Sequence, residues 1–179
     1  MFRVYCVLAM LCALGALAEV PCACDPAEAE SMTLRQCSLC REAEKQASDV
    51  GMFFLKDINP RKPNRWLALP RKHGTGAHHL HDLSRNERTV FWKAAIAKAK
   101  ELWGDEWGLA YNGEKVRTQC HTHVHIGKLL KGIETDRFVV VNRPEDIPVA
   151  PGEGLWVHPA GTSLHVHLGE QITETTLLR

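Results

Sequence analysis

Residues 117–127 read RTQCHTHVHIG and place His121, His123 and His125 at every second position. On a β-strand, alternate residues share one face and lie about 6.5 Å apart. The residues between and after these histidines are β-branched, which suits a strand and gives it an apolar second face. Helical phasing would instead scatter the three imidazoles around the axis. The stretch therefore predicts a half-buried strand with three histidines on one face.

The segments around this strand predict an α+β fold. Ser84 and Glu87 form an S-x-x-E capping box, and apolar residues follow at helical spacing until Gly104 ends the expected helix. Further strands are expected at residues 51–56, 66–69, 108–111, 138–141 and 164–168. The segment FVVV (138–141) is expected to be buried, and the proline- and glycine-rich residues 144–154 are expected to form a loop. Antiparallel strands around one long helix define the class α+β.

The composition indicates one globular domain. The chain has 179 residues, with 22 basic against 21 acidic side chains and a formal charge of +1. This balance lacks the basic surface that nucleic-acid binding needs, so no nucleic-acid partner is expected. An apolar content of 45% is normal for a folded domain and argues against disorder.

The first residues have the pattern of a secretory signal peptide, assigned to residues 1–18. Arg3 precedes a 15-residue apolar run, and residues 16–18 (ALA) provide a cleavage site. The run is shorter than the roughly 20 residues that span a bilayer, which favours a cleaved signal over an uncleaved anchor. The protein is therefore expected to be exported, periplasmic or membrane-associated, with residues 19–36 as a leader.

Cleavage would leave five cysteines, at positions 22, 24, 37, 40 and 120. Disulfides are permitted outside the cytoplasm, so the first four can form two disulfides or supply metal ligands. Cys120 belongs to the histidine strand and points to its other face, where a buried free thiol is expected.

Four interpretations of the histidine strand compete. A solvent-facing strand would mix residue types rather than repeat histidine. A metal site would use neutral imidazoles of a His-x-His pair. Nucleophilic catalysis on phosphorus would use one imidazole to attack and its neighbours to hold the phosphate. A pH sensor would use imidazole titration near neutrality. The spacing by itself does not distinguish the metal site from the nucleophile.

Between residues 37 and 127, the sequence resembles the histidine triad (HIT) superfamily of nucleotidyl hydrolases and transferases. Residues 53–73 (FFLKDINPRKPNRWLALPRKH) are similar to the first strand pair of that superfamily. Asn112 and Thr118 match polar positions that precede the triad. The resemblance implies a HIT-like antiparallel sheet with one main helix packed on it.

Within the superfamily, the sequence is most similar to the CDP-diacylglycerol diphosphatase family. The phrase R-T-Q-x-H-x-H-x-H-I at 117–126, the L-K-D at 55–57 and the closing T-E-x-x-L at 173–177 carry this likeness. The implied organisation is a catalytic domain at 37–131 and a short strand and loop extension at 132–179, packed on the same domain.

The resemblance also implies roles for individual residues. His123, the middle histidine, is the expected nucleophile, because a neutral imidazole attacks phosphorus near pH 7 and forms a nucleotidyl-histidine that water then cleaves. The other expected catalytic residues are His121, His125, Thr118 and Gln119, of which His125 and Thr118 donate hydrogen bonds to the phosphate. The expected substrate-binding residues are Asp57 at the ribose, Leu55 and Ile58 around the base, Asn112, and Arg117 at the phosphate. The alternatives are a turn aspartate for Asp57 and a surface charge for Arg117.

The resemblance implies a structural zinc site as well. Its ligands would be Cys37, Cys40, His73 and His121, a Cys2His2 set suited to tetrahedral zinc. Oxidising conditions outside the cytoplasm favour disulfides instead, such as Cys24–Cys37. Both alternatives stay open from sequence, and both are structural, so the chemistry requires no cofactor.

The function that the resemblance implies is hydrolysis of CDP-diacylglycerol to CMP and phosphatidate. The substrate would bring the enzyme to a membrane surface, and a homodimer is compatible with the superfamily. One alternative is a hydrolase of soluble nucleotides, such as dinucleoside polyphosphates or nucleoside phosphoramidates. Another is a periplasmic metal-binding protein that uses the histidine clusters, including His165 and His167. No carboxylate stands at a convincing metal-ligand spacing from this last pair, which favours a packed strand end.

Overall fold

The computed structural model describes residues 20–179, so the signal peptide expected at residues 1–18 lies outside the described residues. Seven strands form one antiparallel sheet in the order β1-β2-β4-β3-β6-β7-β5. The strands are β1 (Met52–Lys56), β2 (Trp66–Pro70), β3 (Trp107–Tyr111), β4 (Val124–Lys128), β5 (Val139–Val141), β6 (Gly154–Ala160) and β7 (Ser163–Glu170). The helices are α1 (Ser38–Glu44) and α2 (Arg85–Trp103), with short 3-10 turns between elements. The α+β class, with a long helix on an antiparallel sheet, is confirmed.

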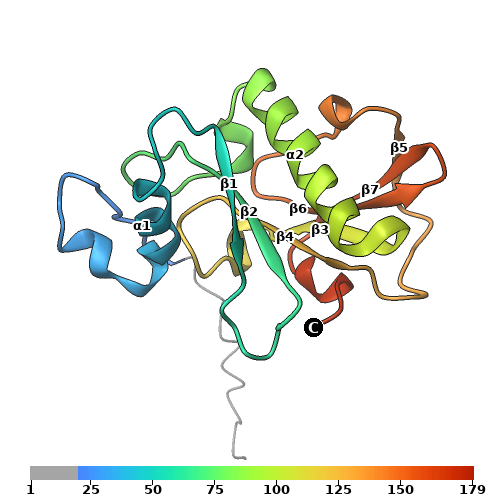
Figure 1. Ribbon diagram of the computed structural model, residues 1–179, viewed down its shortest axis with the longest axis horizontal. Helices are drawn as coiled ribbons and strands as arrows, with labels where there is room; N and C mark the ends of the chain where they lie inside the picture. The colour runs from blue at the N-terminus through green and yellow to red at the C-terminus, as the bar shows by residue number, and fades with distance from the viewer. Residues whose placement is uncertain (1–19) are drawn as a thin grey trace, which may run out of the picture.

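Helix α2 lies across one face of the sheet (Figure 1). The expected capping box is present, since the Ser84 hydroxyl accepts from the Glu87 amide and the Glu87 carboxylate accepts from the Ser84 amide. Gly104 ends the helix with a φ of +56°, a backbone conformation that favours glycine. Phe91 and Trp92 are among the α2 side chains that pack on the sheet and form the main core.

The opposite face of the sheet carries α1 at the β1–β2 end. Ala43 of α1 packs with Phe53, Leu67 and Leu69 of these strands. His125 lies opposite Leu67 in the β2–β4 pairing and shares its face, because directly paired residues project from the same side of a sheet. This second face therefore positions the histidines that the sequence singled out.

The C-terminal residues 132–179 differ from the short extension that the sequence predicts. They contribute three strands to the sheet, including β6, which the sequence analysis missed. The segment FVVV was predicted to be buried, and this is wrong. It forms the edge strand β5, in which Val139 is 42% exposed and Val140 is 56% exposed. An edge strand has a neighbour on one side only, so its side chains are covered less.

Two disulfides constrain the N-terminal segment, and one of them joins it to the rest of the domain. Cys24 is bonded to Cys37, which agrees with the disulfide alternative from sequence. Cys22 is bonded to Cys120 across 98 residues, so the prediction of a free thiol at Cys120 is wrong. Cys40 is the free cysteine of the described range, and it is buried. Residues 20–37 are therefore held against the segment that carries the triad.

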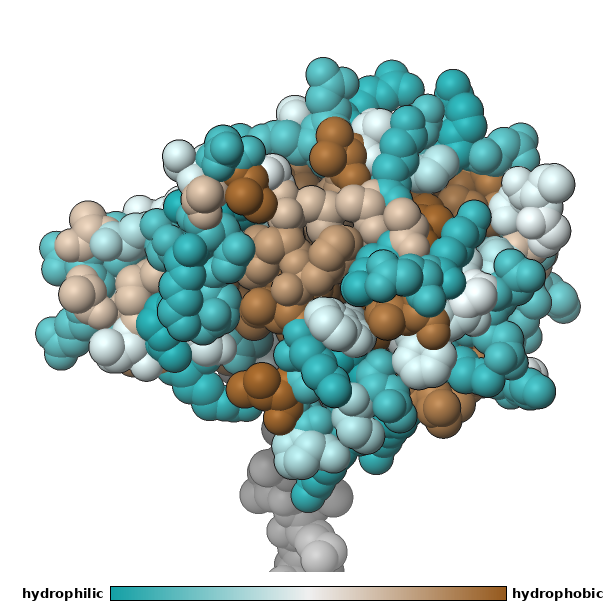
Figure 2. Space-filling model, in the orientation of Figure 1, coloured by the Kyte–Doolittle hydropathy of each residue, from teal (hydrophilic) through white to brown (hydrophobic). Residues whose placement is uncertain are grey.

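Figure 2 shows hydrophobic side chains gathered on the face of the molecule between α1 and α2, where β1 lies. A shallow hollow of about 230 Å³ opens there, lined by Met52, Leu83, Val90 and Phe91 among others. In the described part of the chain, no helix combines the length and the apolar character needed to cross a membrane.

Candidate active site

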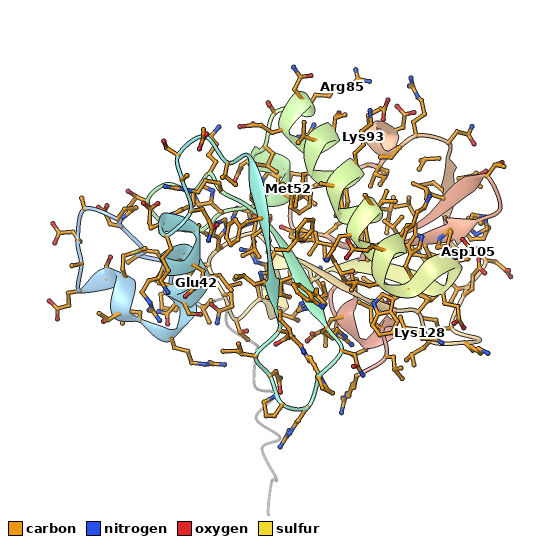
Figure 3. The ribbon with its side chains drawn as sticks, viewed as in Figure 1. Glu42, Met52, Arg85, Lys93, Asp105 and Lys128 are labelled. Atoms are coloured by element: carbon orange, nitrogen blue, oxygen red, sulfur yellow. A yellow bond between two sulfur atoms is a disulfide. The ribbon has the colours of Figure 1, made fainter. Side chains whose placement is uncertain are left out.

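A cleft of about 880 Å³ opens on the face of the sheet opposite α2. Side chains from α1, from the β1–β2 connection, from the segment before β4 and from the C-terminus line it; Figure 3 labels one of them, Glu42 on α1. The predicted site residues that line it are Leu55, Asp57, Ile58, Asn112, Arg117, Thr118, Gln119, His123 and His125. Most of the site predicted from sequence is thus brought together in one place.

The three histidines do not form one strand face, contrary to the sequence prediction. β4 begins at Val124, so of the three only His125 lies on a strand. His123 precedes the strand, and its ring centroid lies 5.0 Å from that of His125 in the cleft. His121 is fully buried behind the cleft, with its ring centroid 5.4 Å from that of His73. Two of the triad histidines therefore face the cleft, and the first belongs to the interior.

Local bonds hold the triad segment in this irregular path. The Cys120 amide donates to the Gln36 carbonyl at 2.8 Å, and the Cys120 carbonyl accepts from the His78 amide at 2.8 Å. The disulfide to Cys22 fixes the same residue through its side chain. Because these backbone groups bond to loops, they cannot pair with a neighbouring strand, and the sheet starts only after His123.

His123 has the tautomer that a nucleophile needs. Its Nδ1 lies 2.9 Å from the carbonyl oxygen of His121, so Nδ1–H donates to this carbonyl and Nε2 keeps its lone pair. Burial lowers the pKa of His123 to about 4. The imidazole is therefore neutral near pH 7, which is the form that attacks phosphorus.

His125 contacts a carboxylate that the sequence analysis did not assign to the site. Its Nε2 lies 3.5 Å from Oε2 of Glu174. The same carboxylate forms ion pairs with Lys62 and with Arg65, whose Nη1 is 3.3 Å away. Burial, with the positive charges of Arg65 and Lys62 nearby, holds the pKa of His125 well below its usual range. His125 is thus a neutral imidazole beside a neutralised carboxylate.

Asn112 and Arg65 place Glu174 in the cleft. Asn112 Oδ1 accepts from the amides of Thr173 at 2.9 Å and Glu174 at 3.0 Å. Arg65 is 1% exposed and donates to the carbonyls of Glu174 at 2.7 Å and Leu177 at 2.6 Å. Asn112, predicted to bind substrate, lines the cleft, but its amide oxygen accepts hydrogen bonds from the C-terminal segment.

Arg117 is not a surface charge. It is buried, and its Nη2 donates to the carbonyl oxygens of His78 at 2.7 Å and Cys120 at 3.0 Å. Its Nη1 lies 2.8 Å from His79 Nδ1. The guanidinium therefore ties the histidine-rich loop to the triad segment while it lines the cleft.

The remaining predicted residues sit at the cleft with few constraints. Gln119 accepts a hydrogen bond from the Ser38 hydroxyl of α1 at 2.8 Å. The Asp57 carboxylate accepts from the Asn59 amide at 2.9 Å, which is the turn role considered from sequence. Thr118 is exposed, and Ile58, which follows β1 in the β1–β2 connection, is 98% exposed.

The predicted Cys2His2 zinc set is not assembled. Cys37 is bonded to Cys24, so it offers no thiolate to a metal ion. Burial raises the pKa of the Cys40 thiol to about 11, which keeps it protonated near pH 7. His73 and His121 remain as neighbours, and both ring nitrogens of His121 lack a hydrogen-bond partner among residues 20–179. The residues present therefore fit the disulfide alternative and do not fit the four-ligand zinc site.

No protein-family model matches the chain, and no curated protein matches it. The residues of the cleft are therefore the basis for assigning a function.

Proposed function

We propose that this protein hydrolyses a phosphoanhydride bond of a nucleotide, with His123 as the nucleophile. The observation that carries the proposal is the bond from His123 Nδ1 to the His121 carbonyl, which leaves Nε2 unprotonated at the cleft. An imidazole in this tautomer attacks phosphorus without a separate base.

The reaction would take place in two steps. In the first, Nε2 bonds to the α-phosphorus and the bond to the bridging oxygen breaks, so that the second phosphate leaves as an anion. In the second, water attacks the phosphorus, the N–P bond breaks, and the nucleoside monophosphate is released with His123 restored. His125 and Thr118 would donate hydrogen bonds to the phosphate oxygens as charge develops.

The charge of the cleft supports an anionic substrate. Five basic side chains line it against three acidic ones: Arg35, Arg41, Lys56, Lys62 and Arg117 against Glu42, Asp57 and Glu174. Glu174 would repel a phosphate at His125, but its ion pairs with Lys62 and Arg65 offset its charge. The cleft is therefore suited to a pyrophosphate group.

The apolar part of the cleft supports a lipid nucleotide, most directly CDP-diacylglycerol, as the substrate. Leu39, Leu55 and Leu67 line it beside the polar groups, and Ile58 projects from its edge almost fully exposed. An exposed isoleucine next to a phosphate-binding cleft suits a substrate that lies in an apolar surface. The products would be CMP and phosphatidate.

Release of CMP from CDP-diacylglycerol micelles in the presence of EDTA tests the proposal. Wild-type protein is expected to release CMP, and His123→Ala is expected to lose this activity. His81→Ala is the matched control, because His81 does not line the cleft, and it should keep the wild-type rate. Equal release by wild type and His123→Ala would contradict the mechanism.

A second panel separates the substrate from the chemistry. If the lipid nucleotide is inert, dinucleoside polyphosphates and nucleoside phosphoramidates are assayed with the same three proteins. If these soluble nucleotides are hydrolysed only when His123 is present, they replace the lipid nucleotide as the assigned substrate, and His123 remains the assigned nucleophile. Inactivity on every substrate would contradict the proposed function as a whole.

A further inference from the structure

A second group of histidines lies on β6 and β7, two and three strands along the sheet from β4. In the pairing of β6 with β7, His158 lies opposite His165, and Trp156 lies opposite His167. Paired and alternate residues share a face of the sheet, so these four side chains project together. The valines between them project into the core under α2. In the sequence, no carboxylate stands at a convincing metal-ligand spacing from His165 and His167.

The structure supplies a carboxylate from Glu134, in the connection between β4 and β5. Its Oε1 lies 3.4 Å from His158 Nε2 and makes a closer contact with His165 Nδ1. The three donor atoms lie within 4.8 Å of one another. Neighbouring ligand atoms on a tetrahedral zinc ion are about 3.3 Å apart, given metal–ligand distances of about 2.0–2.1 Å. One ion would need only small movements of these side chains.

His158 is oriented for metal binding by the backbone. Its Nδ1 lies 3.1 Å from the Pro159 carbonyl oxygen, so Nδ1–H donates there and Nε2 keeps a lone pair. The residue is 4% exposed, and in the described residues Nε2 has no hydrogen-bond partner. A buried polar atom without a partner costs stability, and a metal ion would supply the partner. In metal-binding histidines, the ring nitrogen that does not bind the metal commonly donates to a carbonyl oxygen, as Nδ1 of His158 does here.

A comparable cluster near the cleft is less suited to a metal ion. Glu114 lies 3.0 Å from Nδ1 of His79, and His81 is the third member. However, the Arg117 guanidinium lies 2.8 Å from the same His79 nitrogen and brings a fixed positive charge to it. Both ion-pair partners of Glu134 among residues 20–179 are histidines, so no guanidinium or ammonium pairs with that carboxylate.

We propose that Glu134, His158 and His165 bind one divalent transition-metal ion of the zinc type. Two imidazole nitrogens and one carboxylate oxygen suit such ions, whereas Mg²⁺ and Ca²⁺ take oxygen ligands. Phe138 stacks on His165 with ring centroids 3.8 Å apart and fixes the orientation of that imidazole. Three protein ligands leave a fourth position open for water or a small ligand.

The ion would fasten the β4–β5 connection to β6 and β7. Ile133, next to Glu134, packs in the cluster that contains Leu177 of the C-terminal segment. The site is separate from the proposed hydrolysis, because none of its three ligands lines the cleft.

Titration of tag-free, chelator-stripped protein with Zn²⁺ and with Co²⁺ tests the proposal. Calorimetry is expected to give one site, and the Co²⁺ complex is expected to show the visible absorption of a four-coordinate ion. Glu134→Gln and His165→Ala should each bind Zn²⁺ at least about tenfold more weakly, because loss of an outer-shell partner alone costs about 10–100-fold. Glu134 and His165 are partly exposed, and matching circular dichroism spectra would establish that the variants fold.

Glu114→Gln is the matched control, since it alters the competing cluster and should bind as the wild type does. The proposal is overturned if the wild type binds neither ion, if both ligand variants keep the wild-type affinity, or if Glu114→Gln alone abolishes binding. CMP release is assayed in EDTA, so failure of the metal site and failure of the proposed function are distinguishable.

Discussion

Burial lowers the pKa of His123 to about 4, although the bond from its Nδ1 to the His121 carbonyl favours the protonated form. The protonated imidazole has no lone pair for attack, so activity is expected above this pKa and lost below it. We expect kcat/KM to stay constant from about pH 7 to about pH 5 and to fall about tenfold per pH unit below about pH 4.

A pH series of CMP release, with the folded state checked by circular dichroism at each pH, measures this profile. A decline centred near the ordinary histidine pKa of about 6.5 would contradict the assignment of His123, whose pKa is lowered, as the nucleophile.

Glu174→Gln removes a charge that neutralises two cations while it preserves the shape of the side chain. Arg65 is 1% exposed and would lose its acidic partner, and Lys62 would lose the same one. Hydrogen bonds to charged groups contribute about 1.5–3 kcal/mol each, and Glu174 is partly exposed, so we expect the free energy of unfolding to fall by about 1–3 kcal/mol. Urea denaturation measures the change.

Glu106→Gln is the control for that loss, because it removes an exposed ion pair with Lys128. Its midpoint should match that of the wild type. Equal midpoints for Glu174→Gln and Glu106→Gln would show that the buried Arg65 does not depend on the carboxylate.

The residues of the cleft were predictable from sequence where they stand in or next to the triad motif, as His123 and Gln119 do, or in another segment that resembles the superfamily, as Asp57 does. The two carboxylates that matter, Glu174 and Glu134, were not predictable as site residues. Glu174 reaches His125 because Asn112 and Arg65 bind its backbone, and Glu134 reaches His165 from another connection. Contacts between residues so far apart in the chain leave no spacing signal.

The N-terminal segment depends on its disulfides, because Cys22 is attached to Cys120 across a long stretch of chain. Removal of a native disulfide that closes a long loop costs about 2–5 kcal/mol. We therefore expect Cys22→Ser to lower the free energy of unfolding by that amount in oxidising buffer, as measured by denaturant unfolding.

The same measurement in reducing buffer is the control, where the wild type and Cys22→Ser should become equally stable. Peptide mapping without reduction should recover the Cys24–Cys37 pair from both proteins. Unchanged stability of Cys22→Ser in oxidising buffer would contradict the Cys22–Cys120 bond.

Among the elements, α2 was predicted best, because its capping box and helical spacing are local signals. The strand β6 was missed, since its sequence GLWVHPA contains Pro159, and proline is rare within strands. The triad segment was predicted as a strand from residue alternation, but the bonds of Cys120 to Cys22 and to Gln36 bend it out of the sheet. Alternation reports which side chains share a face only where neighbouring strands are free to pair.

One core joins the N-terminal and C-terminal parts of the chain. Phe91 of α2 belongs to the same buried cluster as Ile126 of β4 and Val157 and Val166 of β6 and β7. In the sheet, β3 pairs with β4 on one side and with β6 on the other. The implied catalytic domain ends at residue 131, but the folded unit does not, because Leu155, Val157 and Val166 of later strands belong to the core under α2.

A chain that ends at residue 131 should therefore fail to fold. It would lose β5, β6 and β7, expose the backbone edge of β3 and uncover part of the apolar side of α2. It would also lose the carbonyls to which the buried Arg65 donates, and a buried cation without partners is costly. We expect the full chain to unfold in one cooperative thermal transition, and the shortened chain to show none. A chain that lacks only the exposed Arg179 is the control and should unfold as the full chain does. A cooperative transition in the shortened chain would show that residues 37–131 form an independent domain and that the later strands only add to it.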